Sequence, residues 1–115
     1  MPDDPTVTDP DLYRVVFEND RVRVLEYHDH PGDRTHPHAH PDSVMVTLTA
    51  FSRRLHGDGR QVDVDLEAGL VRWIDAQEHA GENIGTTDTR AIFVELKEPH
   101  PAGLGPPEAT LGPGV

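Results

Sequence analysis

The sequence consists of short runs of β-favouring residues that are separated by turn-forming residues at regular intervals. Apolar and polar side chains alternate in residues 43–49, and residues 21–27 are similarly rich in β-branched and aromatic residues. Pro31 and Gly32 form one of several strong turn signals between such runs. No segment keeps a 3.6-residue hydrophobic period over three helical turns. This pattern predicts an all-β barrel or sandwich of eight to ten short antiparallel strands.

The 115 residues are expected to form a single domain, which we assign to residues 12–97. Residues 1–11 contain three prolines and four aspartates, and this composition predicts a flexible N-terminal arm. Residues 98–115 contain five prolines and four glycines but few large aliphatic residues, so we expect a disordered tail. The core that remains is small, and self-association into a homodimer is the expected way to bury more surface.

The larger apolar side chains of the strand-like runs are expected to fill the core. These residues are Phe17, Met45, Trp73 and Phe93. Tyr13 and Tyr27 can each place a hydroxyl group in an internal cavity, depending on which face of its strand points inward.

Histidines are concentrated in one part of the chain, because five of the eight lie between His28 and His40. His36, His38 and His40 are spaced two residues apart, and such residues point to the same face of an extended strand. Neutral imidazole is the commonest protein ligand for transition metals. A further histidine far along the chain, His79, would complete a metal site. His28 and His30 are expected to be exposed on the turn before Pro31.

The charge and composition exclude several classes of partner and cofactor. The formal net charge is −11, and the ten basic residues form no large cluster, so neither nucleic acid nor an anionic membrane is an expected partner. The sequence has no apolar run of about 20 residues and no signal-peptide pattern, and we expect a cytoplasmic protein. There are no cysteines, so a metal must be bound by histidine, carboxylate or carbonyl groups.

The histidine stretch resembles the first of two motifs of the cupin superfamily, a group of small jelly-roll barrels. The family pattern is G-x5-H-x-H-x3-E-x6-G, and here Gly32 is followed after five residues by His38 and then His40. The glutamate of the pattern is replaced by Val44, and its final glycine by Phe51.

A second stretch resembles the other cupin motif, G-x5-P-x-G-x-H-x3-N. Gly69, His79 and Asn83 occupy matching places, whereas the proline is replaced by Asp75 and the middle glycine by Gln77. The resemblance extends over about residues 12–97 and implies a small jelly-roll (cupin) β-barrel.

The three histidines retained from both motifs are the expected metal ligands. This set, His38, His40 and His79, is similar to the three-histidine variant found in several cupin dioxygenases. His36 is a possible fourth ligand or outer partner, although Pro37 can turn it away. Gln77 is a possible weak oxygen ligand or a hydrogen-bond donor to a bound substrate.

Three neutral imidazoles leave the full charge on a divalent metal, which favours an anionic chelating small molecule such as an enolate, a catecholate or a hydroxy acid. Fe(II) is the favoured ion, and Zn, Ni, Mn, Cu and Co remain possible. The resemblance therefore implies an oxidoreductase of dioxygenase type. Two alternatives stay open: a non-catalytic protein that binds or senses a small ligand or a metal, and an isomerase or lyase with a redox-silent metal.

Overall fold

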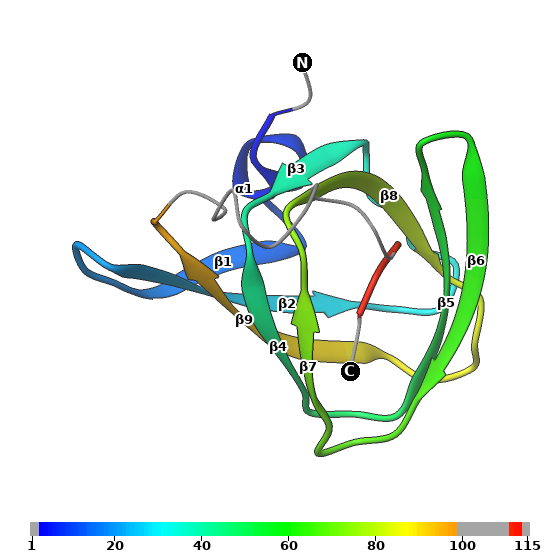
Figure 1. The fold of residues 1–115 in the computed structure, drawn as a ribbon. Helices are drawn as coiled ribbons and strands as arrows, with labels where there is room; N and C mark the ends of the chain where they lie inside the picture. The colour runs from blue at the N-terminus through cyan, green and yellow to red at the C-terminus, as the bar shows by residue number, and fades with distance from the viewer. Residues whose placement is uncertain (1–2, 99–110, 114–115) are drawn as a thin grey trace.

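The computed structural model describes residues 3–98 and 111–113, and nearly all of its regular structure is β-strand (Figure 1). Its elements are α1 (Pro5–Thr8), β1 (Tyr13–Glu18), β2 (Val22–Asp29), β3 (His38–His40), β4 (Ser43–Thr47), β5 (Phe51–Gly57), β6 (Arg60–Leu66), β7 (Val71–Ile74), β8 (Gln77–Asn83) and β9 (Thr89–Leu96). The prediction of an all-β fold is confirmed. The helix α1 has four residues, and no helix among the described residues is long and apolar enough to span a bilayer.

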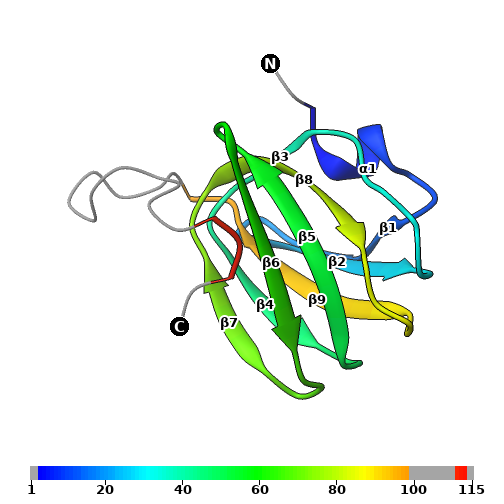
Figure 2. The same cartoon turned by 90° about the vertical axis from the view of Figure 1, so that its right-hand side faces the viewer.

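The strands form two antiparallel sheets that face each other across the core (Figures 1 and 2). One sheet has the order β1-β2-β9-β4-β7, and the other has the order β3-β8-β5-β6. Strands that are distant in sequence lie side by side, as β2 and β9 do along their whole length. The short strand β3 is at the edge of its sheet and begins after Pro37, as expected for a segment that contains a residue without a backbone donor.

The core lies between the sheets, where alternate residues of each strand point inward. Leu25 on β2 pairs with Phe93 on β9, which pairs with Met45 on β4, and all three are buried. The predictions for Met45 and Phe93 are therefore confirmed. Those for Phe17 and Trp73 are wrong, because Phe17 is 54% exposed and Trp73 is only partly buried. Both lie on the outer face of the five-stranded sheet.

The N-terminal residues pack against the barrel through contacts that their composition did not indicate. The Asp4 side chain caps α1, and the carbonyl group of Asp3 accepts a hydrogen bond from the backbone of Ala39 on β3. The buried carboxylate of Asp9 accepts hydrogen bonds from the backbone and the ring of His36. Residues 3–9 are thus attached to the strand that carries the histidine pair.

Most of the predicted tail, residues 99–110, 114 and 115, lies outside the described residues. Leu111 is buried, and the backbone N–H of Gly112 donates a hydrogen bond of 2.8 Å to the side chain of Gln77 on β8. Gly112 also lies directly against Leu55 on β5 and has a positive φ of 79°. This part of the chain therefore packs beside the second histidine motif.

Candidate metal centre

The pairing of β3 with β8 brings the three predicted histidines together. His38 lies directly opposite His79 in the register of these two strands, and His40 lies opposite Gln77. His38 and His40 are two residues apart and therefore share the inward face of β3. Local alternation and one strand pairing are sufficient to assemble the cluster.

The three imidazole rings form a compact triangle in the interior of the barrel. Their centroids are 4.6 Å apart for His38 and His40, and 5.0 Å apart for each of the two pairs that include His79. One ring nitrogen from each histidine lies within 4.8 Å of the other two. His38 and His40 are buried and His79 is half-buried, so the cluster could hold a metal ion at the inner wall of the barrel.

Each of the three rings has its Nδ1 atom next to an oxygen that can only accept a hydrogen bond. The partners are the His36 carbonyl for His38 at 2.7 Å, the Glu95 carboxylate for His40 at 3.2 Å, and the Gln77 amide oxygen for His79 at 2.7 Å. The proton of each neutral ring is therefore assigned to Nδ1, which leaves Nε2 as the atom with a free lone pair. Metal-binding histidines are held by oxygen acceptors in the same way.

The Nε2 atoms of His38 and His40 are buried and have no hydrogen-bond partner among the residues that the structure describes. An unsatisfied buried acceptor costs free energy, so native proteins rarely keep one without a reason. A metal ion held between the rings would satisfy both atoms. The donor set thus fits a transition-metal ion.

Burial keeps the cluster uncharged in the absence of metal. It lowers the pKa of His40 to about 3, with a smaller effect in the same direction from His38. Burial likewise lowers the pKa of His38, and it lowers that of His79 well below the ordinary value, with His40 and His38 adding to the effect. The neutral imidazole is the form that binds a metal, so the site has little need to release protons on binding.

Glu95 is the acceptor for His40 and is almost completely buried. Burial raises the pKa of Glu95, and the guanidinium group of Arg23, which lies 2.7 Å from its other oxygen, opposes this effect. Arg23 also forms an ion pair with Asp4, just before α1. The position of the His40 ring therefore depends on a chain of charged groups that reaches the N-terminal segment.

The side chains of Gln77 and His36 are not part of the cluster of possible ligand atoms that His38, His40 and His79 form. The Gln77 side-chain oxygen accepts hydrogen bonds from His79 Nδ1 and from the Gly112 backbone. The His36 side chain is 77% exposed, and its ring contacts Asp9. His36 instead contributes its carbonyl group, which orients His38.

A cavity of about 50 Å³ lies beside the histidines and is lined mostly by apolar side chains. His38 and His79 form part of its wall, and Met45, Phe51 and Phe93 contribute apolar surface. A single water molecule needs roughly 10 to 15 Å³ of such volume, so the cavity has space for a small ligand only.

Besides the histidines and two threonines, Thr35 and Thr89, the polar part of the cavity wall comes from Tyr13, Tyr27 and Arg53. Arg53 donates hydrogen bonds to the buried Asp29 at 2.6 Å and to the Tyr27 hydroxyl at 3.1 Å, so these groups satisfy one another. No hydrogen bond joins the Tyr13 hydroxyl to the part of the chain that the structure describes. Burial raises the Tyr13 pKa above its ordinary value, so this hydroxyl stays protonated and can act as a donor.

Comparisons with known proteins give matches to solved structures alone, since no family model and no curated protein matches. A cupin domain from Bordetella pertussis Tohama I has 28% identity and a TM-score of 0.71, over 76% of this chain and 93% of that chain. The protein has the cupin fold. A double-stranded β-helix protein from Klebsiella pneumoniae has 25% identity and a TM-score of 0.59, over 74% of this chain and 70% of that one.

A polyketide cyclase, RemF from Streptomyces resistomycificus, has the same cupin fold. It has 23% identity and a TM-score of 0.56, over 77% of this chain and 66% of that one. The resemblance to cupins that the two histidine motifs indicated is thus confirmed for the fold, together with a three-histidine cluster that could hold a metal.

The pairing of β4 with β9 places Val44 away from the histidine cluster. Val44 was matched to the glutamate of the first motif, but Val44 is only partly buried and does not line the cavity. Met45, the next residue, lies in the cavity wall with His38 and His79. Successive residues of a strand point to opposite faces, so Val44 points away from the cavity that Met45 lines.

Sequence reasoning also missed Glu95 and Gly112. Glu95 lies on the inward face of β9 in the alternation that includes Ala91 and Phe93. An acidic residue at an otherwise apolar inward position was a usable signal, because such a group is rarely buried without a partner. Gly112 carried no comparable signal, because its segment shows no strand or helix pattern.

Proposed function

We propose that this cupin is a metal-dependent oxidoreductase of dioxygenase type that acts on a small anionic chelating molecule. His38, His40 and His79 would hold a divalent transition metal through Nε2, with Fe(II) the favoured ion. The observation that carries this proposal is the set of three rings whose Nδ1 atoms each face an oxygen acceptor. When bound, such an ion supplies Lewis acidity and, in the case of Fe(II), reactivity toward O2.

The ligand set favours an anionic substrate. All three protein ligands would be neutral, since burial holds the pKa of each ring below its ordinary value. The carboxylate of the common cupin motif is absent, and Met45 lies in the cavity instead. The negative charge needed to balance a divalent ion would therefore come from the substrate, as an enolate, a catecholate or a hydroxy acid provides.

The side chains of the cavity wall would position the substrate and exclude water from it. Met45, Phe51 and Phe93 present apolar surface to the small space beside His38 and His79. The Tyr13 hydroxyl is protonated and is available to donate a hydrogen bond to an oxygen of the substrate. The volume of about 50 Å³ favours a compact substrate.

Few side chains of the cavity wall are suited to act as a general acid or base. The described residues of the cavity wall include no aspartate or glutamate, and burial raises the pKa of both Tyr13 and Tyr27 above the ordinary value. A proton acceptor near neutral pH is therefore lacking among these side chains. This supports chemistry that depends on a metal over chemistry that depends on a side-chain base.

The test is reconstitution of the metal-free protein with Fe(II), followed by measurement of O2 consumption with a panel of small enolates, catechols and hydroxy acids. We expect O2 uptake that depends on one member of the panel and that disappears in His79→Ala. Replacement of Tyr13 by Phe should raise KM for that substrate more than it lowers kcat, because a positioning hydrogen bond is lost. Binding of these compounds to the Fe(II) protein without O2 uptake would contradict the dioxygenase assignment.

A second candidate is a reaction with a redox-silent metal, such as isomerisation, elimination or cyclisation. The observation that favours it is the similarity of the fold to a protein named as a polyketide cyclase. Loading with Zn(II) or Ni(II) and assay of the same panel under anaerobic conditions distinguishes the two candidates. Turnover that persists without O2 would support the second. Ligand binding with no turnover in either condition would instead indicate a binding or sensing protein.

A further inference from the structure

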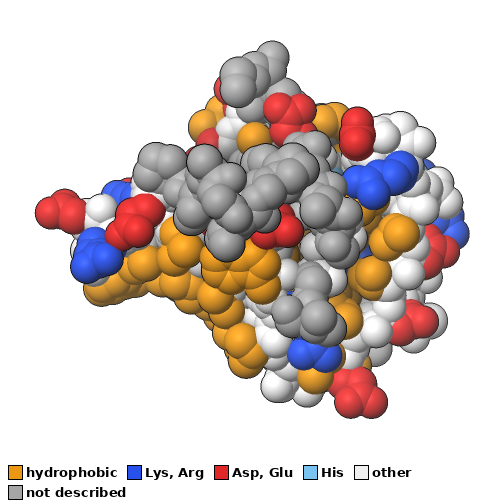
Figure 3. Space-filling model, in the orientation of Figure 1, with side chains coloured by type: hydrophobic (Ala, Val, Ile, Leu, Met, Phe, Trp, Pro, Cys, Tyr) orange, Lys and Arg blue, Asp and Glu red, His pale blue; other side chains and the backbone are white. Residues whose placement is uncertain are grey.

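The outer surface of the molecule offers little attraction to an anion. Acidic side chains lie on several sides of the face seen in Figure 3, and the formal net charge of the chain is −11. A charge of this sign and size repels anions from the surface. Recognition of an anionic substrate therefore has to come from groups inside the barrel.

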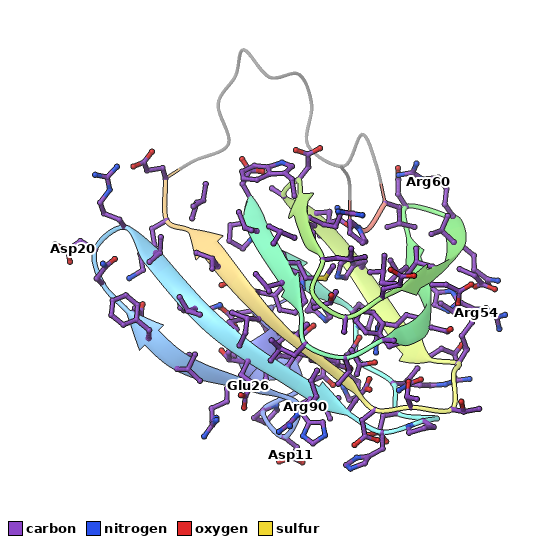
Figure 4. All side chains as sticks on the ribbon, turned by 90° about the horizontal axis from the view of Figure 1, so that it is seen from below. Asp11, Asp20, Glu26, Arg54, Arg60 and Arg90 are labelled. Atoms are coloured by element: carbon purple, nitrogen blue, oxygen red, sulfur yellow. The ribbon has the colours of Figure 1, made fainter. Side chains whose placement is uncertain are left out.

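Arg53 on β5 is the one buried arginine in the described part of the chain. Its side chain forms part of the cavity wall together with His38 and His79. A guanidinium group stays charged in proteins, so Arg53 places a permanent cation in this wall. Other arginines lie at the outside of the barrel in Figure 4, namely Arg54, Arg60 and Arg90.

Three of the five N–H groups of the Arg53 guanidinium have acceptors within the protein. Nη1 donates to Asp29 at 2.6 Å and to Thr89 at 3.2 Å, and Nη2 donates to the Tyr27 hydroxyl at 3.1 Å. The Tyr27 hydroxyl itself donates to Asp29, so these two acceptors lie side by side along the edge between Nη1 and Nη2. The Nε–H and the second N–H of Nη2 have no acceptor among the residues that the structure describes.

The two unused N–H groups of Arg53 form one edge of the planar guanidinium. The N–H bonds of Nε and Nη2 are nearly parallel, and this geometry matches the two oxygens of a carboxylate. A buried donor without an acceptor costs free energy, so an unused pair on a charged group requires a reason. A bound carboxylate would satisfy both N–H groups at once.

The unused edge of Arg53 lies beside Gly81 on β8, where the absence of a side chain leaves space. A Cβ atom at Gly81 would lie 3.0 Å from Nη2 and 3.5 Å from Nε of Arg53. Gly81 follows His79 by two residues, so the two share the inward face of β8, and both line the cavity. The space beside the edge is therefore one inward-facing position, or roughly 7 Å along the strand, from the His79 ligand.

We infer that Arg53 binds a carboxylate group of the substrate while the other end of the same molecule chelates the metal. The substrate is then a small 2-hydroxy or 2-oxo dicarboxylate, and this inference rests on the metal-dependent function proposed above. A chain of about four carbon atoms, with bonds of roughly 1.5 Å, spans the separation together with its metal and hydrogen bonds. A catechol has no carboxylate for Arg53, and a simple hydroxy acid has none left once its own carboxylate chelates the metal.

The charges inside the barrel agree with a substrate that is a dianion. Arg53 and Asp29 form an ion pair of 2.6 Å and neutralise each other. A divalent ion on three neutral imidazoles then leaves two positive charges to be balanced. The described residues of the cavity wall include no aspartate or glutamate, so a dicarboxylate would supply both negative charges.

The experiment is calorimetric titration of the Zn(II)-loaded full chain, without O2, with malate and with 2-hydroxybutyrate. The two acids have the same number of carbon atoms and the same chelating end, and a methyl group in 2-hydroxybutyrate replaces the remote carboxylate of malate. We expect malate to bind roughly 10- to 100-fold more tightly, as is usual for hydrogen bonds between charged groups. Zn(II) is redox-silent, so the result does not depend on reactivity toward O2.

Gly81→Ala tests the position of the carboxylate while Arg53 and its buried partners stay in place. The added methyl group would occupy the space beside the two unused N–H groups. The affinity for malate should fall to that for 2-hydroxybutyrate, and the latter should not change. Gly85→Ala is the matched control, because a Cβ there also meets atoms at 3.3 Å but lies outside the cavity wall, and this variant should keep the preference for malate.

Arg53→Lys is a second variant, which covers the case in which Gly81→Ala does not fold. Lysine keeps a positive charge for Asp29 but lacks the planar edge, so the preference for malate should disappear while the metal content, measured by elemental analysis, stays the same. Equal affinity of the wild type for the two acids, or a preference for malate that survives in both variants, would overturn the inference and leave the proposed dioxygenase reaction standing. A preference for malate with no O2 uptake by the Fe(II) protein would contradict the dioxygenase reaction alone.

Discussion

His38 and His40 on β3, and His28 and His30 at the end of β2, are two His-x-His pairs with the same spacing but different surroundings. Each pair meets a third candidate ligand, which is His79 for the first pair and Asp88 for the second. In both clusters the candidate ligand atoms lie within 4.8 Å of one another. Spacing and proximity therefore do not distinguish the two.

The difference lies in what holds the rings. In the barrel cluster each Nδ1 donates to an oxygen acceptor, and two Nε2 atoms are buried without a partner among the described residues. In the surface cluster His28 Nε2 is already 3.1 Å from Asp88, and the His30 ring is 69% exposed with carboxylates near both of its nitrogens. The surface rings are thus partly exposed or already bound to a carboxylate, and neither His28 nor His30 has a buried nitrogen without a partner. A strong metal site requires oriented rings with free lone pairs, and only the barrel cluster has them.

The largest expected effect is that of metal on stability. Removal of metal with a chelator should lower the thermal midpoint by roughly 10 to 20 °C relative to protein at 100 times the metal Kd, since such binding stabilises by about 2.7 kcal/mol. Differential scanning fluorimetry checks this. The double variant His28→Ala/His30→Ala should show the same shift as the wild type. If metal removal no longer changed the thermal midpoint of this variant, the surface cluster would be the metal site instead of the barrel cluster.

Loss of one oxygen acceptor should weaken metal binding without removal of a ligand. Gln77→Ala frees the Nδ1 atom of His79, and we expect the metal Kd to rise about 10- to 100-fold. A metal titration with a competing chelator gives the value. The corresponding change in the surface cluster, Asp33→Ala, removes a carboxylate near His30 and should leave the Kd unchanged. An unaltered Kd in Gln77→Ala would show that orientation of His79 does not depend on this bond.

The metal-free protein should lose stability as the pH falls below about 6.5. The folded state holds His40 neutral with a pKa of about 3, whereas the unfolded chain takes up a proton near the ordinary value of 6.5. Between these values the unfolded state binds more protons, so the free energy of unfolding decreases as the pH falls, by up to about 1.4 kcal/mol per pH unit for this group. Thermal midpoints between pH 7 and pH 5, in the presence of a chelator, test the direction. A midpoint that rises toward pH 5 would contradict burial of a neutral ring.

The smallest effect concerns the segment that includes Gly112. A Cβ at this position would overlap Leu55 on β5, so Gly112→Ala should displace the segment and break its hydrogen bond to Gln77. The metal Kd should rise only a few-fold, as expected for one hydrogen bond of about 1 kcal/mol. Gly59→Ala is the matched control, because Gly59 also has a positive φ but has no atom within 4 Å of the added Cβ. Equal effects of both variants would mean that the segment does not support the site.

The sequence predicted the fold and the barrel cluster for a simple physical reason. Alternation along β3 places His38 and His40 on one face, and the spacing of the second motif brings His79 to the paired strand. These relations are local or involve a single pairing. The face on which Phe17 lies was mispredicted because the register of β1 is irregular between Val15 and Phe17. The face on which Val44 lies is set by the pairing of β4 with its neighbours, which alternation alone does not fix.

Two of the ring acceptors, His36 and Gln77, lie two residues from their histidines, but other groups that support the site were less predictable because they come from distant parts of the chain. Glu95 follows His40 by 55 residues and Gly112 follows Gln77 by 35, and no short motif joins them. The contacts of the N-terminal residues, such as Asp9 with His36, depend in the same way on tertiary packing. Composition predicted a flexible arm because it reports average apolar content and not specific polar contacts.

The most direct test of the difference between the two clusters is the number of divalent metal ions bound per chain. Untagged wild-type protein, a variant with His38→Ala and His79→Ala, and a variant with His28→Ala and His30→Ala should be loaded with the same ion, desalted and measured by elemental analysis. We expect about one ion per chain in the wild type and in the second variant, and close to none in the first. A first variant that retains its metal, or a second variant that loses it, would contradict the assignment of the metal site to the barrel cluster.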